Sequence, residues 1–252
     1  MDQYGIIGNP LSHSFSPAYF NARFVREGIP AEYTAFPLDS IGLLPGLIAA
    51  HPALRGLNVT IPYKTAVIPY LQGLSAAASA INAVNCIRMV EGKLFGFNTD
   101  HYGFSESLKP LLQAGITDAL VLGTGGSSKA VCYALEQLGL RYHLVSASGN
   151  GDYTYADLSE TIIRSHLLIV NTTPLGMSPH TTECPDIPYH FLGGSHVLYD
   201  LVYNPEETLF LQKGRIQGAQ TKNGYEMLLL QADQSWAIWN SGDVLTEFSV
   251  SA

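Results

Sequence analysis

The hydrophobic positions in the first part of the chain form short runs, separated by segments with helical spacing. Between the first two runs, Pro17–Glu27 places Ala18, Phe20, Phe24 and Val25 where they share one face of a helix. The runs themselves are strand-like, and they read YGIIG, AEYTAF, LNVTI and NAVNCIRMV. Short strands that alternate with helices predict an α/β fold.

A tight reversal is expected at Glu91-Gly92. These two residues separate NAVNCIRMV from KLFGFN, a second strand-like run. This spacing predicts a β-hairpin. The hairpin would add an antiparallel edge to an otherwise parallel sheet.

A helix is expected from Asp100 to about Leu112, and after it a second rhythm begins. Strands and helices now alternate at the spacing of a doubly wound parallel sheet. The expected elements are strand ALVLG, helix Ser128–Leu138, strand YHLVS, helix Leu158–Ser165, and strands HLLIVNTT, HVLYDLVY and GAQTKN. The closing stretch Gly224–Asn240 is predicted to be helical.

Composition and charge narrow the class of protein. The chain has 252 residues, 46% hydrophobic and 13% charged, so it can bury a substantial core. Its formal charge is −8 and it has no basic run, which argues against a nucleic-acid partner. No apolar run reaches the roughly 18 residues that cross a bilayer, and the first residues lack a signal-peptide pattern. We therefore expect no membrane partner.

Cysteine and histidine usage carries two further expectations. Cys86, Cys132 and Cys184 form no CxxC pair, which suits buried thiols in a reducing cytosol better than a disulfide framework. The eight histidines show no HExxH or other ligand spacing. The sequence thus predicts a cytoplasmic protein without a metal site.

A glycine-rich turn opens the second rhythm, in the stretch ALVLGTGGSSKAV. Gly123, Gly125 and Gly126 follow an apolar strand and precede a helix, which is the context of a dinucleotide-binding turn. Ser128 stands where the GxGxxG pattern has its third glycine, and it is small enough to allow close packing. The flanking strand and helix favour dinucleotide binding over a plain tight turn.

The residues after the next strand do not indicate whether the cofactor is NAD or NADP. An acid there would bind a ribose 2′-hydroxyl, and an arginine would bind a 2′-phosphate. The stretch reads LVSASGNGDY, with neither Arg nor Lys from Leu144 to Ile163 and with Asp152 as its first acid.

Four stretches taken together resemble the shikimate dehydrogenase family, and the likeness covers nearly the whole chain. They are IGNPLSHSFSP (7–17), NVTIPYK (58–64), INAVNCI with GFNTD (81–87 and 96–100), and NTTPLGM with YDLVYNPEET (171–177 and 199–208). The resemblance implies reduction of the ketone of 3-dehydroshikimate to shikimate, usually with NADPH. It also implies an N-terminal α/β substrate domain, 1–101 completed by 225–252, and a Rossmann-type dinucleotide-binding domain, 102–224.

The family's functional residues carry over onto matching positions. Lys64 matches the catalytic lysine and Asp100 its partner aspartate. Ser14 and Ser16 match the hydroxyls that hold the substrate carboxylate, and other substrate-pocket positions match Asn58, Thr60, Asn85, Tyr203 and Gln231. The pyrophosphate turn matches Gly123, Thr124, Gly125, Gly126 and Ser127. Segments near the nicotinamide match Asn171, Thr172, Thr173, Pro174, Leu201 and Gly224.

The chemistry suits these residue types, although each also has a plain structural interpretation. Hydride transfer to a ketone builds negative charge on oxygen, and an ammonium stabilises that charge or donates a proton. Without the resemblance, the sequence favours a solvated strand end for Lys64, and Asp100 suits an N-cap of the helix that begins there. Ser14 and Ser16 stand near a helix start, where hydroxyls are ordinary caps.

The cofactor stretch departs from the family. Relatives that use NADP commonly have an arginine just after the second strand of this domain, where this chain has Ala147. Either Arg141 or Lys129 reaches the 2′-phosphate, or discrimination is poor, or NAD is used.

The leading hypothesis is a cytoplasmic shikimate dehydrogenase that uses NADP and acts on a small-molecule substrate, as a monomer or homodimer. The runner-up is a quinate/shikimate dehydrogenase that uses NAD or both cofactors. From another class, a non-catalytic dinucleotide or metabolite sensor would share the fold, but the presence of both Lys64 and Asp100 argues against it.

Overall fold

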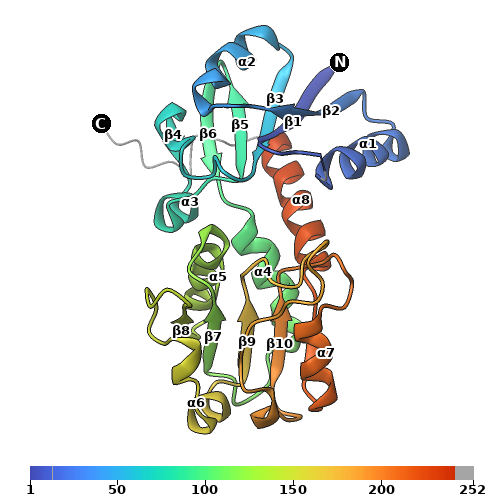
Figure 1. Cartoon of the computed structure of the whole chain (residues 1–252). Helices are drawn as coiled ribbons and strands as arrows, with labels where there is room; N and C mark the ends of the chain where they lie inside the picture. The colour runs from blue at the N-terminus through green and yellow to red at the C-terminus, as the bar shows by residue number, and fades with distance from the viewer. Residues whose placement is uncertain (13, 242–252) are drawn as a thin grey trace. The chain divides into compact units, whose positions relative to one another are not determined.

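The structure is a computed structural model, and it describes residues 1–12 and 14–241 (Figure 1). The chain divides into two compact units. Unit 1 comprises residues 1–99 together with the chain from Ala232 onward, and unit 2 comprises residues 100–231. Each unit is built on a sheet of its own.

The sheet of unit 1 has six strands in the order β2-β1-β3-β5-β6-β4. Strand β1 pairs in parallel with β2 and β3, β5 pairs antiparallel with β3 and β6, and β4 pairs in parallel with β6. The strands are β1 (Asp2–Gly8), β2 (Ala31–Pro37), β3 (Leu54–Val59), β4 (Gly73–Leu74), β5 (Cys86–Val90) and β6 (Lys93–Phe97).

The predicted hairpin is formed by β5 and β6. Glu91 and Gly92 in its turn have φ values of 50° and 76°, as a tight reversal between antiparallel strands requires. The expectation that this hairpin forms the sheet edge was wrong. The short strand Gly73–Leu74 pairs with β6 and takes the edge, so both hairpin strands lie inside the sheet.

Helices cover both faces of this sheet, because neighbouring residues of a strand point to opposite faces. Tyr4 and Ile6 of β1 pack with residues of α1 and of the last part of α8, whereas Ile7 packs with residues of α2 and α3. The helices are α1 (Ser16–Glu27), α2 (Leu44–Ala50), α3 (Ala76–Ile81) and α8 (Tyr225–Asn240).

The sheet of unit 2 has five parallel strands in the order β11-β10-β9-β7-β8. The chain enters at β7, moves outward to β8, and then returns to the other side of β7 to form β9. This reversal of direction is the switch point at which doubly wound folds bind ligands. The strands are β7 (Asp118–Leu122), β8 (Arg141–Val145), β9 (Leu168–Asn171), β10 (Val197–Asp200) and β11 (Gln220–Lys222).

Helices also cover both faces of the second sheet. Ala119 and Val121 of β7 pack with residues of α4, α5 and the first part of α8, and Leu120 and Leu122 pack with residues of α6 and α7. These helices are α4 (Asp100–Leu108), α5 (Gly126–Gln137), α6 (Glu160–Ser165) and α7 (Leu209–Ile216). The alternation confirms the predicted Rossmann-type layering.

Several element boundaries differ from the prediction for local reasons. Helix α4 ends at Leu108 rather than Leu112, because Pro110 cannot donate a backbone hydrogen bond, and a 3₁₀ turn (Lys109–Leu111) follows. Helix α7 was not predicted at all. The other 3₁₀ turns are Ile41–Leu43, Ile68–Tyr70, Tyr155–Asp157 and Tyr189–Phe191.

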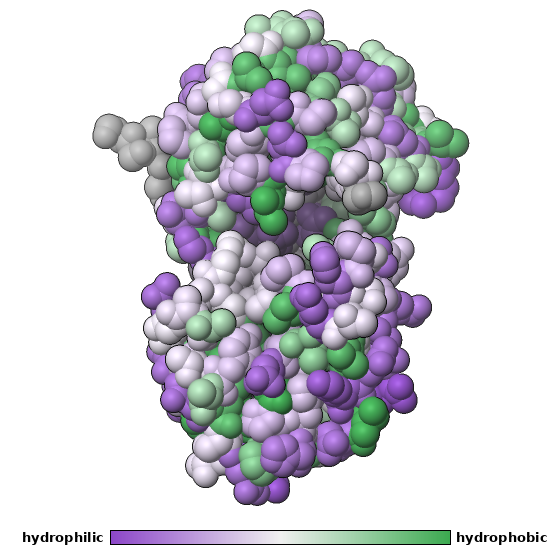
Figure 2. Space-filling model, viewed as in Figure 1, coloured by the Kyte–Doolittle hydropathy of each residue, from purple (hydrophilic) through white to green (hydrophobic). Residues whose placement is uncertain are grey.

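The visible surface mixes polar and hydrophobic residues. On the face drawn in Figure 2, hydrophilic residues in purple are interspersed with hydrophobic residues in green over both units. Over the described part of the chain, every helix is too short or too polar to span a membrane.

Candidate functional site

A network of hydrogen-bonded polar side chains lies buried in unit 1. Ser16, the first residue of α1, hydrogen-bonds the hydroxyl of Tyr33. That hydroxyl donates to Oδ1 of Asn58 at 2.8 Å. Nδ2 of Asn58 in turn donates to Oγ of Ser235 at 3.0 Å and to the carbonyl oxygen of Asn85 at 3.1 Å. Burial raises the pKa of Tyr33 well above its usual value, so this hydroxyl stays neutral and donates.

The same network continues to Thr99, the last residue of the first segment of unit 1. Nδ2 of Asn85 donates to Oγ1 of Thr99 at 2.9 Å, and the backbone N–H of Thr99 donates to Oδ1 of Asn85 at 2.6 Å. Oγ1 of Thr99 also lies 3.3 Å from Oγ of Ser235. The network therefore brings together Ser16, Asn58 and Asn85, which are three of the predicted substrate residues. Polar side chains that are this deeply buried require such partners.

Asp100 follows Thr99 directly and is the first residue of helix α4. An N-cap stands before the first helical residue, so that position falls on Thr99. The interpretation of Asp100 as an N-cap was therefore wrong. Asp100 instead places a carboxylate in the first turn, where the positive end of the helix dipole stabilises it.

Lys64 lies in a turn beyond strand β3. The strand ends at Val59 rather than near Ile61, because the carbonyl oxygen of Thr60 accepts a turn hydrogen bond from Tyr63 N at 2.9 Å. Lys64 is therefore not a strand end, and its side chain is half-buried.

Backbone hydrogen bonds link the Lys64 turn to Asn85. The carbonyl oxygen of Lys64 accepts from Val84 N at 2.7 Å, and the N–H of Val59 donates to Asn85 O at 2.9 Å. The hydroxyl of Tyr63 donates to the carbonyl oxygen of Leu38 at 2.5 Å and fixes the turn from the other side. The backbone of Lys64 is thus hydrogen-bonded to Val84, the residue directly before Asn85 of the polar network.

The other predicted residues of unit 1 lie on loops at the carboxyl ends of its parallel strands. Thr60 donates its N–H to Ile7 O at 2.9 Å, and Ser14 donates its N–H to Leu11 O at 3.1 Å. Helix α1 has no side-chain cap, so the interpretation of Ser14 and Ser16 as capping residues was wrong.

The glycine turn of unit 2 lies between β7 and α5. Gly123 has φ +106°, and a Cβ there would stand 2.9 Å from Oγ1 of Thr172, so both backbone and space require glycine. A Cβ on Gly125 or Gly126 would meet nothing within 4 Å. The third-glycine position, Ser128, is buried and donates to Gly125 O at 2.6 Å.

The start of α5 offers what a pyrophosphate needs. The first N–H groups of a helix have no partner within the helix, and they carry the positive end of its dipole. Here the N-cap is a glycine without a capping side chain, and the first turn of α5 contains no acid. Open space over Gly125 and Gly126 lets an anion approach this backbone, so the residues fit a dinucleotide phosphate.

Asn171 and its neighbours stand beside the glycine turn. Oγ1 of Thr172 donates to Leu122 O at 2.7 Å, which joins the end of β9 to the end of β7. Asn171 is fully buried, and its Oδ1 accepts from the N–H and hydroxyl of Thr173 at 3.0 and 2.7 Å. These residues form one cluster with Gly123, as expected for segments that line one ligand.

Asp200 is a central group of this cluster that the sequence analysis did not single out. Its carboxyl accepts from Nδ2 of Asn171 at 2.9 Å, from Val202 N at 3.0 Å and from the hydroxyl of Thr208 at 2.5 Å. Burial raises the pKa of Asp200 to about 6, and these hydrogen bonds partly offset that rise. The sequence offered one signal for this role: Asp200 is a single acid that directly follows the run HVLY.

Leu201 and Gly224 join the same cluster through the backbone. The N–H of Leu201 donates to Asn171 O at 3.0 Å, and a Cβ on Gly224 would lie 2.1 Å from Leu201 O. Tyr203 is more exposed, and partial burial raises its pKa. Gln231 lies on α8 and donates from Nε2 to Leu228 O at 3.0 Å.

The region after β8 contains no cation for a 2′-phosphate. Arg141 begins β8, at the end of the strand opposite the glycine turn, and it pairs with Asp118 at 2.7 and 2.8 Å. Its expected role toward a 2′-phosphate does not fit that position. Lys129 is exposed on the first turns of α5. Ala147 is flanked by Ser146 and Ser148, whose hydroxyls lie 3.0 Å apart.

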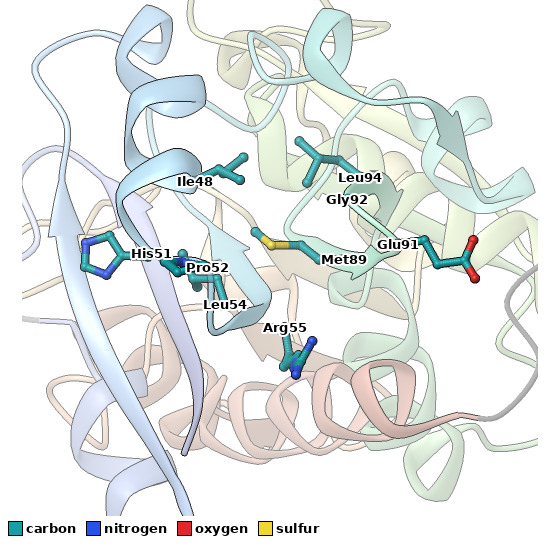
Figure 3. Close-up of a pocket in the computed structure, with 9 residues that line it drawn as sticks. All are labelled: Ile48, His51, Pro52, Leu54, Arg55, Met89, Glu91, Gly92 and Leu94. Atoms are coloured by element: carbon teal, nitrogen blue, oxygen red, sulfur yellow. The ribbon is translucent and has the colours of Figure 1, made fainter.

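A separate cavity of about 200 Å³ opens at the amino end of β3 (Figure 3). Ile48, Leu54, Met89 and Leu94 form its apolar lining. Asn58 and Lys64 lie toward and beyond the carboxyl end of that strand, so this cavity is not the site described above.

Fold and site together define a class: an α/β protein with a dinucleotide-type turn in one unit and a buried polar network in the other. A family model described as the shikimate dehydrogenase substrate binding domain matches residues 6–87. The shikimate dehydrogenase (NADP(+)) of Clostridium beijerinckii is 39% identical, over 95% of this chain and 92% of that protein. The chain belongs to the shikimate dehydrogenase family.

Solved structures agree with this membership. The shikimate 5-dehydrogenase of Thermus thermophilus, in complex with NADP(H) and shikimate, is 32% identical with a TM-score of 0.83, over 95% of this chain and 94% of that one. The shikimate 5-dehydrogenase of Listeria monocytogenes, in complex with shikimate and NAD, is 27% identical with a TM-score of 0.81, over 95% and 91%. The prediction of the family is confirmed.

Proposed function

We propose that this protein is a shikimate dehydrogenase that reduces 3-dehydroshikimate to shikimate with NADPH, in the cytoplasm, as a monomer or homodimer. The observation that carries the proposal is the buried network of unit 1, in which Ser16, Asn58 and Asn85 share hydrogen bonds. Family membership adds the substrate, because the relatives reported above are named for it.

Under this proposal, unit 1 binds the substrate and unit 2 binds the cofactor. Ser14 and Ser16 present hydroxyls to the substrate carboxylate, and Asn58, Thr60 and Asn85 face its ring hydroxyls; Tyr203 and Gln231 are proposed as further substrate-binding residues. A pocket built to hydrogen-bond hydroxyls rejects analogues that lack them, because its own polar groups would be left unpaired. The network around Asn58 and Asn85 supports this role by fixing both amides.

The cofactor supplies a hydride to the ketone carbon when it is bound. The turn from Gly123 to Ser127, which includes Thr124, would hold its pyrophosphate through backbone N–H groups, and Asn171 to Pro174, Leu201 and Gly224 would line it toward the nicotinamide. The open space above Gly125 and Gly126 and the absence of an acid in the first turn of α5 support this assignment.

Lys64 and Asp100 handle the proton. The ketone oxygen gains charge as the hydride arrives, and the Lys64 ammonium stabilises that charge and delivers a proton, so that the oxygen becomes a hydroxyl. Asp100 keeps the lysine charged and oriented. The held backbone of the Lys64 turn supports this role, because a proton donor must be positioned before it can act.

One specific observation favours a second cofactor. The region around Ala147 offers hydroxyls and no cation, and Arg141 is engaged by Asp118. We therefore keep the alternative of a quinate/shikimate dehydrogenase that uses NAD or both cofactors. The Listeria relative solved with NAD is consistent with this alternative. A non-catalytic sensor is disfavoured because it has no use for the lysine and aspartate together.

Initial rates with shikimate and with quinate, each with NADP⁺ and with NAD⁺, test the proposal. We expect the fastest turnover with shikimate and NADP⁺. A preference for NAD⁺, or comparable rates with quinate, would support the alternative enzyme. Absence of turnover on shikimate with either cofactor, in protein shown to be folded, would refute both and favour a sensor.

A further inference from the structure

Cys184 and Lys213 are in direct contact in unit 2, and neither is among the residues assigned above to the substrate or the cofactor. Nζ of Lys213 donates to Sγ of Cys184 at 3.3 Å. The same Nζ lies 4.8 Å from the centre of the Tyr189 ring, so a cation–π contact holds it in place. Tyr189 also shares a hydrogen bond with Cys184 and donates its hydroxyl to Pro185 O at 2.7 Å.

Cys184 differs from the other two cysteines in its surroundings. Cys86 and Cys132 are buried, and burial raises the pKa of each thiol to about 12, which keeps both protonated and unreactive. Cys184 is a free thiol of intermediate exposure, and Lys213 is likewise only partly buried. A small oxidant therefore reaches Cys184 more readily than the other thiols.

We propose that a peroxide joins Cys184 to Lys213 through a single oxygen atom, forming an Sγ–O–Nζ bridge. Peroxide first converts the thiol to a sulfenic acid, which is the reversible first step of cysteine oxidation. A second peroxide supplies the remaining two-electron oxidation as the amine is captured. One thiol, one lysine ammonium and two H₂O₂ give the bridge, three H₂O and one released proton. Sulfur and nitrogen are each oxidised by two electrons, and the peroxide oxygens are reduced.

The geometry favours this outcome over further oxidation of the sulfur. The nitrogen already contacts the sulfur, and Tyr189 restrains the lysine, so capture needs no search by a flexible side chain. The partners are 29 residues apart in sequence and lie in different elements, Cys184 between β9 and β10 and Lys213 on α7. The bridge therefore closes a loop, and a crosslink of this kind stabilises the fold by restricting the unfolded chain.

Intact-mass measurement of the full-length protein after hydrogen peroxide treatment tests the inference. We expect a gain of about 14 Da, equal to one oxygen gained and two hydrogens lost, whereas a sulfenic acid gains about 16 Da. Peptide mapping should join the peptides that carry Cys184 and Lys213, and dithiothreitol should restore both. The thermal midpoint of the bridged protein should rise.

Two variants provide matched controls. Lys213→Arg keeps the positive charge but has no amine to capture, so it should gain about 16 Da or higher oxidation products instead. Cys184→Ser should show neither change. A wild-type protein that gives only sulfenic, sulfinic or sulfonic products would overturn the proposal, and so would a gain of about 14 Da in either variant.

Discussion

The buried carboxyl of Asp200 connects three segments of unit 2 through hydrogen bonds. Its carboxyl accepts from Asn171, from Val202 and from Thr208, which caps helix α7. One side chain therefore ties the end of β9, the loop after β10 and the start of a helix. The end of β9 and the loop after β10 also carry residues proposed to line the cofactor.

The raised pKa of Asp200 predicts a specific pH dependence. Its folded value of about 6 exceeds the ordinary value of 3.8, so the folded state binds the proton more tightly than the unfolded state. Its contribution to stability is then complete below pH 3.8 and declines as the pH rises through about 6, by about 3 kcal/mol in total. The variant Asp200→Asn keeps the shape and should flatten this part of the stability curve.

Urea unfolding across that pH range measures the effect. Asp157→Asn is a suitable control, because Asp157 is an exposed acid whose pKa is lowered by its bonds to Thr154. An unchanged slope in Asp200→Asn would show that the carboxyl is already ionised throughout.

Gly123 should not tolerate a side chain. Alanine there would adopt φ +106° and press against Thr172, so we expect Gly123→Ala to lose about 1–3 kcal/mol of stability and to weaken cofactor binding. Gly193→Ala is the matched control, since a Cβ at Gly193 meets nothing within 4 Å. Thermal unfolding and cofactor titration measure both; equal behaviour of the two variants would contradict the steric argument.

Residue roles were predictable from the sequence where a motif named them, and less so where contacts are long-range. Asn58 and Asn85 stand in motifs, but Ser235 reaches Asn58 across 177 positions. Thr99 stands in the GFNTD motif without having been singled out, and nothing local to Ser235 signals a buried hydroxyl. Their role depends on helix α8 returning to the first sheet, which only the folded chain reveals.

At the scale of elements, hydrophobic periodicity predicted most strands of both sheets but missed strand β4 and helix α7. Strand β4 has two residues, too few for an alternating pattern. Helix α7 spans Leu209–Ile216, and its sequence LFLQKGRI opens with an apolar run that carries no clear helical period. Its start is fixed by Thr208, whose hydroxyl accepts from Leu211 N and donates to Asp200.

The docking of α8 on the first sheet depends on a glycine. A Cβ on Gly56 of β3 would lie 2.2 Å from Nε1 of Trp239, and that nitrogen donates to Ile87 O at 3.0 Å. We expect Gly56→Ala to destabilise the protein by about 1–3 kcal/mol through overpacking. Gly46→Ala in α2, where a Cβ meets nothing within 4 Å, should be neutral or slightly stabilising.

Intrinsic fluorescence gives a local readout of this contact. Both tryptophans of the chain, Trp236 and Trp239, belong to the cluster around Tyr4 and Phe24. Their emission should shift in Gly56→Ala and not in Gly46→Ala. Native emission together with native stability in Gly56→Ala would contradict the packing argument.

At the scale of the whole molecule, the two units differ in continuity. Unit 2 is one continuous segment, 100–231, whereas unit 1 needs the chain from Ala232 onward to complete its core. The expected domain boundaries, 1–101 with 225–252 and 102–224, stay a prediction. Helix α8 is continuous from Tyr225 to Asn240, so hydrophobic periodicity does not indicate the boundary between the two units within it.

This difference predicts how fragments behave. A fragment of residues 100–231 retains both packed faces of its sheet and should fold alone and bind NADP⁺. A fragment of residues 1–99 lacks Ala232 and Trp239 and should stay unfolded or aggregate. Circular dichroism and cofactor titration measure this. A cooperatively folded 1–99 fragment would show that α8 is dispensable to the first unit.

The central claim is that Lys64 handles the proton of a shikimate–NADP⁺ reaction, and the variant Lys64→Ala tests it most directly. Turnover should be measured beside equilibrium binding of shikimate, with Lys93→Ala as control, because Lys93 is an exposed lysine at the start of β6. We predict that kcat of Lys64→Ala falls by about 10²- to 10⁴-fold while shikimate affinity changes far less. Turnover equal to that of the wild type and of Lys93→Ala would contradict the account.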